Sequence, residues 1–344
     1  MFEAVIALCL DLADGPCRDQ LLPGYEAMTQ AACTASLRSA PPQVSWSGEQ
    51  GAPQCVTVAP PLSVDQVAPG IFVHMGRIAE PDQDNRGDVA NMGFIVGEDS
   101  VAVIDTGAAR WLGEGLWRAI RARTDKPVSH VILTHMHPDH VFGVSVFADA
   151  GAKVVGHGGL GRALADRQAN YTESLNRLIG AEAMIGTELR PIDITVEDAI
   201  DIDLGGRLLR LQAWPAAHTR VDITVTDLET SIMFAGDLVF HRHTPALDGK
   251  LRGWQAVLAE MARLSITKVV PGHGGPLLSW PEGAAAQQAY LQTLEKDARQ
   301  AVHEGQRLGD AVETIAASEA AKWELFEAFN PRNATVAYTE LEWE

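Results

Sequence analysis

The sequence predicts an α/β protein in which helices cover packed β-sheets, preceded by a small α+β segment held together by disulfides. Two observations lead to this fold class. From residue 70 onward, short apolar runs bounded by turn residues alternate with stretches of helical periodicity, a pattern typical of sheets with helices on their outer faces. The four cysteines all lie within the first 55 of the 344 residues. With 46% hydrophobic and 21% charged residues, the composition is that of a globular protein.

Residues 1–60 are predicted to form a small cysteine-rich domain. An even number of cysteines confined to one short segment favours two disulfides over the alternative, four buried thiols in a cytosolic protein. The chain has no C-x-x-C pair, which disfavours a zinc ribbon. Three pairings are open and the sequence does not choose between them, although we weakly prefer Cys17–Cys33 with Cys9–Cys55. Disulfides would imply an oxidising compartment.

The patterns within this segment predict a strand at 3–10, a helix at 25–38 and a strand at 54–58, in a βαβ-like arrangement. The proline-rich stretch "APPLS" at 59–63 indicates a linker. A second domain is therefore expected at 65–344.

Predicted strands and helices alternate in this second domain. The strands are expected at 70–76, within 91–107 on either side of a hairpin turn at 97–100, and at 128–135, 152–157, 207–213, 221–227, 231–235, 267–275 and 335–343. The helices are expected at 109–123, 159–179, 252–264, 282–304 and 307–329. A polar, turn-rich stretch at 77–90 is predicted to be a long loop.

Charge and hydropathy exclude several classes of partner. The net charge of −18 disfavours nucleic acid and anionic membranes, which both need a basic patch. No apolar run approaches the ~20 residues that cross a bilayer, so we expect no membrane insertion. The run Ala4–Leu10 follows Glu3 and lacks preceding basic residues, so it is not expected to be a secretory leader. An exported form would have a leader that this sequence lacks.

The stretch "THMHPDH" at 134–140 places four metal-ligating side chains within six residues. His135 and His137 are two positions apart, so in extended chain both imidazoles face the same way. Pro138 ends any strand ladder, after which Asp139 and His140 turn to another side. Imidazole and carboxylate groups suit zinc, and also iron or manganese. Four ligands are too many for one tetrahedral ion with an open position, which indicates two ions.

Further ligands are expected at the ends of other strands. His218 in "PAAHT", Asp237 in "FAGDL" and His273 in "PGHGG" each follow an apolar run and lie beside small residues. Strand ends of this kind meet at one edge of a sheet, where functional sites are normally built. Asp105 in "VIDTG" ends a strand in the same way and is expected to orient one of the ligand imidazoles.

From about residue 65 to its end, the chain resembles the metallo-β-lactamase superfamily, because these five motifs occur in the superfamily's order. The resemblance implies a four-layer αββα sandwich with two metal ions at one edge. It implies the following ligands: His135, His137 and His218 on the first metal, Asp139, His140 and His273 on the second, and Asp237 bridging both.

Asp237 resembles the ligand of glyoxalase II-type hydrolases. The best-known lactamases have a cysteine at this place, whereas this chain has no cysteine after residue 55, which weakens a plain lactamase interpretation. "GDLVF", "HTPALDGKLRGW", "KVVPGHGGP" and "AYTELEWE", behind the cysteine-containing segment, are similar to the SoxH-like metallohydrolases. That resemblance implies a periplasmic location and a quinoprotein dehydrogenase system as the partner.

The resemblance implies a metal-dependent hydrolase with two Zn²⁺ per chain and a small-molecule substrate. A metal-bound hydroxide would attack the carbonyl of an ester, thioester, lactone or amide, including β-lactams. Asp139 would bind the second metal and accept a hydrogen bond from the hydroxide. Two alternatives remain open: a mononuclear iron sulfur-dioxygenase, and a non-enzymatic accessory that handles metal or cofactor for a quinoprotein system.

Two further groups are open to either a functional or a structural interpretation. His241 and His243 follow Asp237 closely and are hypothesised to bind substrate or stabilise the oxyanion; equally, they are surface histidines in a polar loop. The loop at 77–90 is either a plain connection or a flap over the site. A flap would use three carboxylates to set substrate charge preference: Asp82, Asp84 and Asp88.

Overall fold

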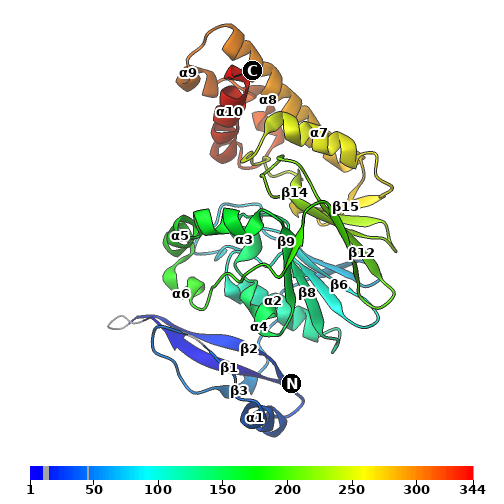
Figure 1. The fold of residues 1–344 in the computed structure, drawn as a ribbon. Helices are drawn as coiled ribbons and strands as arrows, with labels where there is room; N and C mark the ends of the chain where they lie inside the picture. Colours follow the sequence, from blue (N-terminus) through cyan, green and yellow to red (C-terminus); the bar gives the residue numbers. More distant parts are fainter. Residues whose placement is uncertain (11–14, 45, 344) are drawn as a thin grey trace.

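The computed structural model describes residues 1–10, 15–44 and 46–343. Two β-sheets pack face to face, and helices cover the outer face of each, which gives four layers in the order αββα (Figure 1). A smaller sheet with its own helix lies at the N-terminal end, beneath these layers in the figure. This arrangement confirms the predicted fold class.

The first large sheet has the strand order β10-β9-β8-β7-β6-β5-β4, antiparallel from β4 to β7 and parallel from β7 to β10. Its strands are β4 (Asp65–Ala68), β5 (Ile71–His74), β6 (Met92–Val96), β7 (Val101–Ile104), β8 (Val128–Ile132), β9 (Lys153–His157) and β10 (Ile194–Val196). The second has the order β11-β12-β13-β14-β15-β16. Its strands are β11 (Ala199–Asp203), β12 (Leu208–Ala213), β13 (Ile223–Asp227), β14 (Ile232–Phe240), β15 (Lys268–His273) and β16 (Leu278–Ser279).

Strand β7 shows how the period of two builds the layers. Val101 and Val103 pack into the core beneath the helices, whereas Ala102 and Ile104 pack into the core between the two sheets. Strand β14 divides its residues in the same way between the second helical layer and the core between the sheets. Apolar residues on both faces explain why these strands read as continuous hydrophobic runs rather than alternating ones.

Each large sheet has its own helical layer. The first sheet is covered by α2 (Arg110–Arg121), α3 (Pro138–Val141), α4 (Ser145–Asp149), α5 (Leu160–Ile179) and α6 (Ala181–Met184). The second is covered by α7 (Leu251–Met261), η1 (Glu282–Ala284), α8 (Ala285–His303), α9 (Leu308–Val312), η2 (Ala317–Lys322) and α10 (Phe326–Glu342). None of the helices in the described part of the chain has the length and apolarity that crossing a bilayer would require.

The predicted strand at 335–343 is wrong, because this segment belongs to helix α10. Its buried residues Ala334, Ala337, Tyr338 and Leu341 are spaced three or four apart, which is the stripe of a helix packing on a core. The predicted helix at 307–329 is instead divided between α9, η2 and the start of α10.

The N-terminal segment consists of β1 (Phe2–Cys9), β2 (Cys17–Ala27), α1 (Gln30–Ser39) and β3 (Gln54–Thr57). The sheet order is β2-β1-β3 and both pairings are antiparallel, so the predicted βαβ-like order is wrong. The predicted helix at 25–38 began too early, because the Thr29 side chain accepts a hydrogen bond from the Ala32 amide and fixes the helix start there.

The predicted disulfides are present, but the preferred pairing Cys17–Cys33 with Cys9–Cys55 is wrong. Cys9 pairs with Cys17, and Cys33 pairs with Cys55. The register of the β1–β2 hairpin places Cys9 directly opposite Cys17, whereas the second bond joins α1 to β3. That second bond closes a separation of 22 residues, for which the loss of entropy in the unfolded chain stabilises the fold by roughly 3 kcal/mol.

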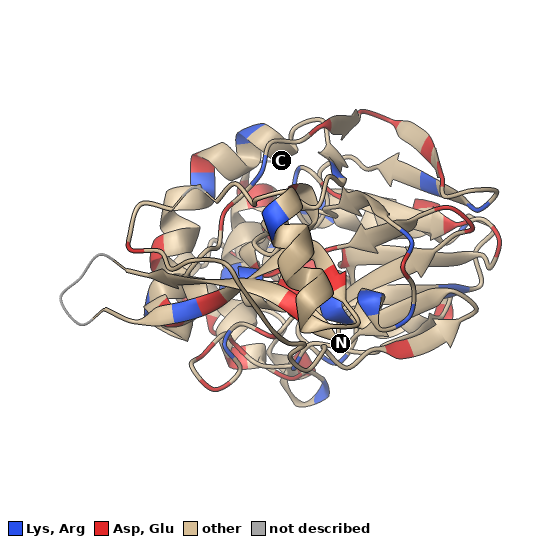
Figure 2. Ribbon diagram, turned by 90° about the horizontal axis from the view of Figure 1, so that it is seen from below, with Lys and Arg blue, Asp and Glu red and all other residues tan. Residues whose placement is uncertain are grey.

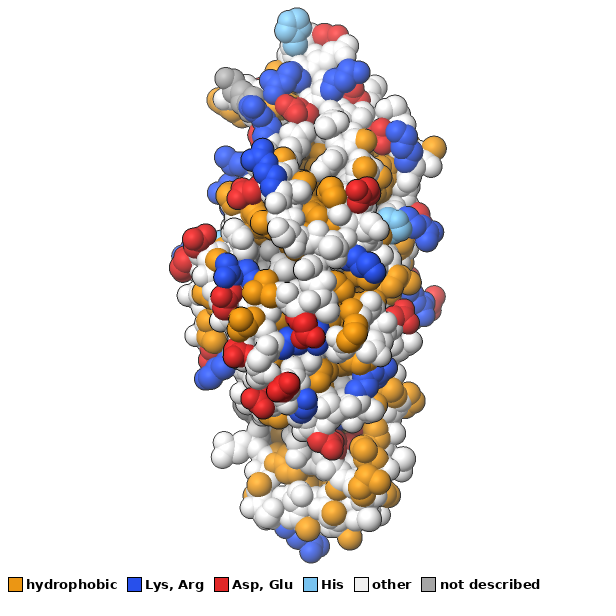
Figure 3. Space-filling view, turned by 90° about the vertical axis from the view of Figure 1, so that its right-hand side faces the viewer, with side chains coloured by type: hydrophobic (Ala, Val, Ile, Leu, Met, Phe, Trp, Pro, Cys, Tyr) orange, Lys and Arg blue, Asp and Glu red, His pale blue; other side chains and the backbone are white. Residues whose placement is uncertain are grey.

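Buried ion pairs join the N-terminal sheet to helix α2. Figure 2 shows the ribbon from the N-terminal end, with the positions of acidic and basic residues coloured. The Arg18 guanidinium donates to both Glu114 oxygens, at 2.7 and 3.0 Å. Arg118 donates to Glu3, at 2.8 Å in the shortest contact. In each pair one residue belongs to the small sheet and the other to α2. The two pairs together fix the orientation of the small sheet on the larger body. On the face drawn in Figure 3, by contrast, acidic and basic side chains are interspersed on the open surface.

We expect Glu114→Gln to lower the free energy of unfolding by about 3–5 kcal/mol, because it leaves buried guanidinium groups without their carboxylate. The side chain is 3% exposed and also lies 3.4 Å from Arg110. Denaturant titration measures this loss. Asp166→Asn is the matched control, since its pair with Arg162 on α5 is highly exposed and should contribute little.

The effect of Glu114→Gln should also depend on pH. Burial alone would raise the pKa of Glu114, but the charges of Arg18, Arg110 and Arg118 outweigh burial and hold the pKa below its usual value. A carboxyl group with a lowered pKa stabilises the fold above its unfolded pKa of about 4.3, and this contribution disappears as the pH falls through the folded pKa. The difference between wild type and variant should therefore be constant at neutral pH and shrink on acidification; a constant difference down to pH 3 would contradict this.

Candidate metal centre

The predicted ligands come together at one edge between the two large sheets. Two groups have ligand atoms that all lie within 4.8 Å of one another. The first group contains His135, His137, His218 and Asp237, and the second contains Asp139, His140 and His273. All seven side chains that the sequence singled out as ligands are thus neighbours in space.

The local chain path explains how the 134–140 stretch serves both groups. The segment follows β8, bends at His135 and Met136, and brings His135 and His137 into the same group of ligands. Pro138 is the first residue of α3, a position where its fixed φ suits a helix start and its missing N–H costs nothing. The change from extended chain to helix carries Asp139 and His140 to the second group.

Asp237 lies between the two groups. Its Oδ2 is 3.6 Å from His135 Nε2 and 3.4 Å from His218 Nε2 in the first group. Its Oδ1 is 3.2 Å from His140 Nε2 and 3.4 Å from His273 Nε2 in the second. One oxygen for each group is the arrangement expected of a carboxylate that bridges two cations.

Hydrogen bonds fix the orientation of the imidazoles from their far sides. The Nδ1 of His140 lies 2.8 Å from Asp105, that of His273 lies 2.9 Å from the Val89 carbonyl, and that of His218 lies 2.5 Å from the Ala246 carbonyl. A carbonyl or carboxylate requires Nδ1–H as donor, which leaves Nε2 of each ring as the ligating nitrogen.

Asp105 is the residue that organises the second group, as its place at a strand end predicted. It has a positive φ of 57°, a strained conformation for a residue other than glycine. Its side chain accepts hydrogen bonds from the amide and hydroxyl of Thr134 as well as from His140, each at 2.8 Å. The end of β7 is thereby tied to the start of the ligand stretch.

His137 is oriented by residues that sequence reasoning did not find. Its Nε2 lies 3.1 Å from Asp248, and its Nδ1 lies 3.0 Å from His218 Nε2. Asp248 in turn forms an ion pair with Arg167 of helix α5. Because Asp248 and Arg167 are 81 residues apart in the chain, no local pattern could have indicated this contact.

Three buried polar atoms indicate that cations fit this centre. His135 Nε2, His140 Nε2 and Asp237 Oδ1 are buried and have no hydrogen-bond partner among the described residues. Such atoms are rare in proteins because burying a polar group without a partner is costly. All three point into the cluster and belong to the donor types that zinc prefers, so divalent cations held by the two groups would satisfy them.

The pKa values of the histidines in the cluster are shifted in different directions. Burial lowers the pKa of His218 to about 3 and, with the neighbouring histidines, that of His135 well below the usual value. Burial acts in the same direction on His140, but the charges of Asp237, Asp105 and Asp139 outweigh it and raise the pKa of that ring. His135 and His218 are therefore neutral, which is the form that binds metal.

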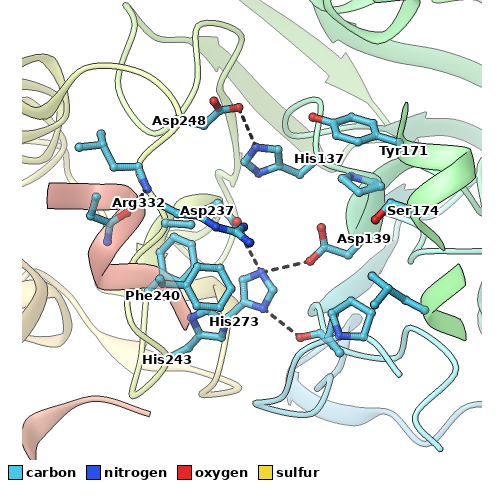
Figure 4. A pocket seen from close by; sticks show the side chains of 18 of the residues that line it. His137, Asp139, Tyr171, Ser174, Asp237, Phe240, His243, Asp248, His273 and Arg332 are labelled. Atoms are coloured by element: carbon cyan, nitrogen blue, oxygen red, sulfur yellow. Dashed lines mark hydrogen bonds and ion pairs between the residues drawn. The ribbon is translucent and has the colours of Figure 1, made fainter. Parts of the chain in front are cut away.

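A cavity of about 470 Å³ opens onto the centre (Figure 4). Five predicted site residues line it: His137, Asp139, Asp237, His243 and His273. The other three predicted ligands, His135, His140 and His218, are buried behind them. The rest of the lining is largely apolar and comes mainly from α5, α10, the loop at 77–90, and the end of β14 with the loop that follows it.

The two histidines after Asp237 have different surroundings. His243 is buried against Phe329 and His273 and lines the cavity. Its Nδ1 lies 2.6 Å from the Thr244 carbonyl, so the neutral ring presents an acceptor, not a donor, at Nε2. His241 does not line the cavity; its backbone amide donates to the His273 carbonyl at 3.0 Å.

The loop at 77–90 contributes apolar residues to the cavity, namely Ala79, Pro81 and Val89. Its three carboxylates do not line the cavity. Asp82 accepts hydrogen bonds from the amides of Asp84 and Asn85, and Asp88 pairs with His74 at 2.7 Å. No contact between these three carboxylates and the cavity therefore supports the hypothesis that they set the charge preference for substrate.

Comparison with known proteins identifies the family. The model of the metallo-beta-lactamase superfamily matches residues 85–273, which span all seven ligands. "Probable metallo-hydrolase YqjP" of Bacillus subtilis is 26% identical over 224 residues, covering 54% of this chain and 67% of that protein. "Acyl-coenzyme A thioesterase MBLAC2" of Bos taurus is 28% identical over 219 residues, covering 54% of this chain and 74% of that protein.

Solved structures share the fold. A metallo-beta-lactamase from Pontibacter korlensis superposes with a TM-score of 0.55 at 20% identity, covering 67% of this chain and 99% of that chain. The sec-alkylsulfatase Pisa1 from Pseudomonas sp. gives a TM-score of 0.64 at 15% identity, covering 81% and 50% of the two chains. The protein belongs to the metallo-beta-lactamase superfamily and is a metal-dependent hydrolase.

We expect Gly272→Ala to weaken metal binding at least tenfold, within the range of 10- to 100-fold known for residues that support ligands. A Cβ at this position would lie 2.0 Å from Asp237 Oδ1, so the bridging carboxylate would have to move. Competition with a zinc chelator measures the affinity. Gly161→Ala on α5 is the control, because its Cβ would meet no atom closer than 3.9 Å. Equal zinc affinity in both variants would contradict the placement of Asp237.

Proposed function

We propose that the protein is a dinuclear zinc hydrolase that cleaves carboxylic esters and thioesters with an apolar acyl group. One observation carries the proposal: two groups of ligands share the carboxylate of Asp237 at the floor of a largely apolar cavity. A volume of about 470 Å³ lies within the usual range for small-molecule sites.

His135, His137 and His218 would hold one zinc ion, Asp139, His140 and His273 the other, and Asp237 would bridge them. When bound, such ions activate water as a nucleophile at neutral pH and polarise a carbonyl oxygen. The donor set supports the dinuclear form over the mononuclear iron alternative. That alternative needs only two histidines and one aspartate, whereas here the remaining ligands lie equally close together in two groups.

Asp139 is placed to handle a proton at the cavity floor. Its Oδ2 is 3.4 Å from His273 Nε2, and the side chain is 18% exposed, so it faces the cavity that a substrate would enter (Figure 4). A carboxylate in this position orients a water molecule by accepting its hydrogen bond and then passes the proton to the leaving atom.

Tyr171 on α5 supplies a donor on the opposite wall from α10. Its hydroxyl oxygen accepts a hydrogen bond from Arg167 at 3.3 Å, so its own proton is free for a substrate oxygen. Burial raises the pKa of Tyr171, which keeps the hydroxyl protonated at neutral pH. Neutral His243 presents only an acceptor, and we therefore assign it to substrate contact and not to stabilisation of the oxyanion.

The apolar lining favours substrates with an acyl chain. The name of the bovine relative, an acyl-coenzyme A thioesterase, supports the thioester class. Lactones and β-lactams offer the same carbonyl chemistry and belong in the same assay. The two disulfides support an oxidising location such as the periplasm, where a quinoprotein system remains our proposed partner.

The test is hydrolysis by zinc-loaded protein of a panel of esters, thioesters, lactones and β-lactams. We expect turnover of acyl esters or thioesters, and we expect Asp139→Ala to lower kcat at least a hundredfold, as removal of a proton-transfer group does. Asp84→Asn is the control, because this loop carboxylate is exposed and does not line the cavity. Full activity of Asp139→Ala, or no turnover across the panel with both zinc sites filled, would refute the proposal.

A further inference from the structure

Two helices from distant parts of the chain form facing walls of the cavity. Tyr171, Ser174 and Leu178 lie along one stripe of α5, and Phe329 and Val336 lie along one stripe of α10. The α5 residues are three or four apart and the two α10 residues are seven apart, so each set spans seven positions of one helix face, which is about 10 Å at the rise of an α-helix. The cavity is therefore a slot about two helical turns long, bounded by α5 and α10.

Arg332 lies on the α10 stripe, midway between Phe329 and Val336. Figure 4 shows it across the cavity from Tyr171 and Ser174. Its side chain is exposed, and it makes no ion pair with any residue that the structure describes. The other arginine of the cavity, Arg167, is already neutralised by Asp248. Of the two arginines that line the cavity, Arg332 is thus the one whose charge is not paired with a carboxylate of the described residues.

The net negative charge of the chain gives this arginine of the cavity, unpaired among the described residues, a specific use. A protein with a net charge of −18 repels anions in general, so an anionic group that lies away from the metal centre needs a cation close to it. A guanidinium binds carboxylate or phosphate with two parallel hydrogen bonds. The wall around Arg332 is apolar, which suits the rest of an amphipathic molecule.

We propose that α10 selects the substrate: an ester or thioester whose apolar acyl chain lies between α5 and α10, and whose other part carries an anionic group bound by Arg332. This inference rests on the proposed hydrolase function and narrows it to anionic substrates. The anion is a carboxylate or a phosphate, since a guanidinium recognises both, and the experiment separates these two sources.

Three octanoyl thioesters test the proposal on zinc-loaded protein: the neutral N-acetylcysteamine thioester, the 3-mercaptopropionate thioester with a carboxylate, and octanoyl-coenzyme A with phosphates. Thiol release follows turnover. We expect Arg332→Gln to lower about tenfold the ratio of kcat/KM for an anionic thioester to that for the neutral one, mainly through KM. Loss confined to the mercaptopropionate or to the coenzyme A thioester identifies the anion as carboxylate or phosphate.

Two controls make this loss specific. Arg332→Lys should retain part of the preference, because it keeps the charge but loses the paired hydrogen bonds. Arg307→Gln removes the same charge from an exposed position outside the cavity and should leave the ratio unchanged. An unchanged ratio in Arg332→Gln, or an equal loss in Arg307→Gln, would overturn the inference while the hydrolase function stands.

Absence of turnover by the wild type would refute the proposed function instead. In that case, calorimetric titration with the same three thioesters still decides the role of Arg332. Tighter binding of the anionic compounds that Arg332→Gln abolishes supports the inference, and equal binding of all three by wild type and variant overturns it.

Discussion

The carboxylate of Asp237 is the interaction on which this centre depends. Five imidazoles gathered in a buried space would repel one another if charged and would lack partners if neutral. Asp237 lies within 3.2–3.6 Å of four of them and offers one oxygen to each group. The burial of Asp237 alone would raise its pKa, yet His273, His140 and His135 hold the pKa of this carboxyl well below its usual value. The carboxylate and the imidazoles therefore require each other, and the two cations that we propose would bind both.

The fold supplies this arrangement because several strands end at the same edge. Asp105 follows β7, the 134–140 stretch follows β8, and His273 ends β15. Contacts behind the ligands then fix each ring: Asp105 holds His140, and Asp248 holds His137. Such supports matter as much as the ligands, because an imidazole free to turn loses affinity for metal. In our proposal, the slot between α5 and α10 is the surface that distinguishes one acyl compound from another.

Local signals in the sequence were sufficient to predict helices that cover packed sheets and to single out the candidate ligands, whereas the four-layer order came from the resemblance to the superfamily. Histidines two apart in extended chain, and acidic residues after apolar runs, are visible without the fold. Helix α10 was missed because "TVAYTELEW" alternates in polarity while also carrying a helical stripe. The disulfide pairing failed because β2, with Pro23 and Gly24 inside it, does not look like a strand. Asp248 acts through contacts with His137 and Arg167, which lie far from it in the chain, and Arg332 meets α5 only across the cavity, so no local pattern indicates either residue.

Anomalous diffraction at the zinc edge, on crystals of the zinc-loaded protein, tests the central claim most directly. The account predicts two peaks per chain: one among His135, His137 and His218, the other among Asp139, His140 and His273, with the Asp237 carboxylate between them. A single peak at full occupancy with excess zinc, or zinc bound away from Asp237, would contradict the account.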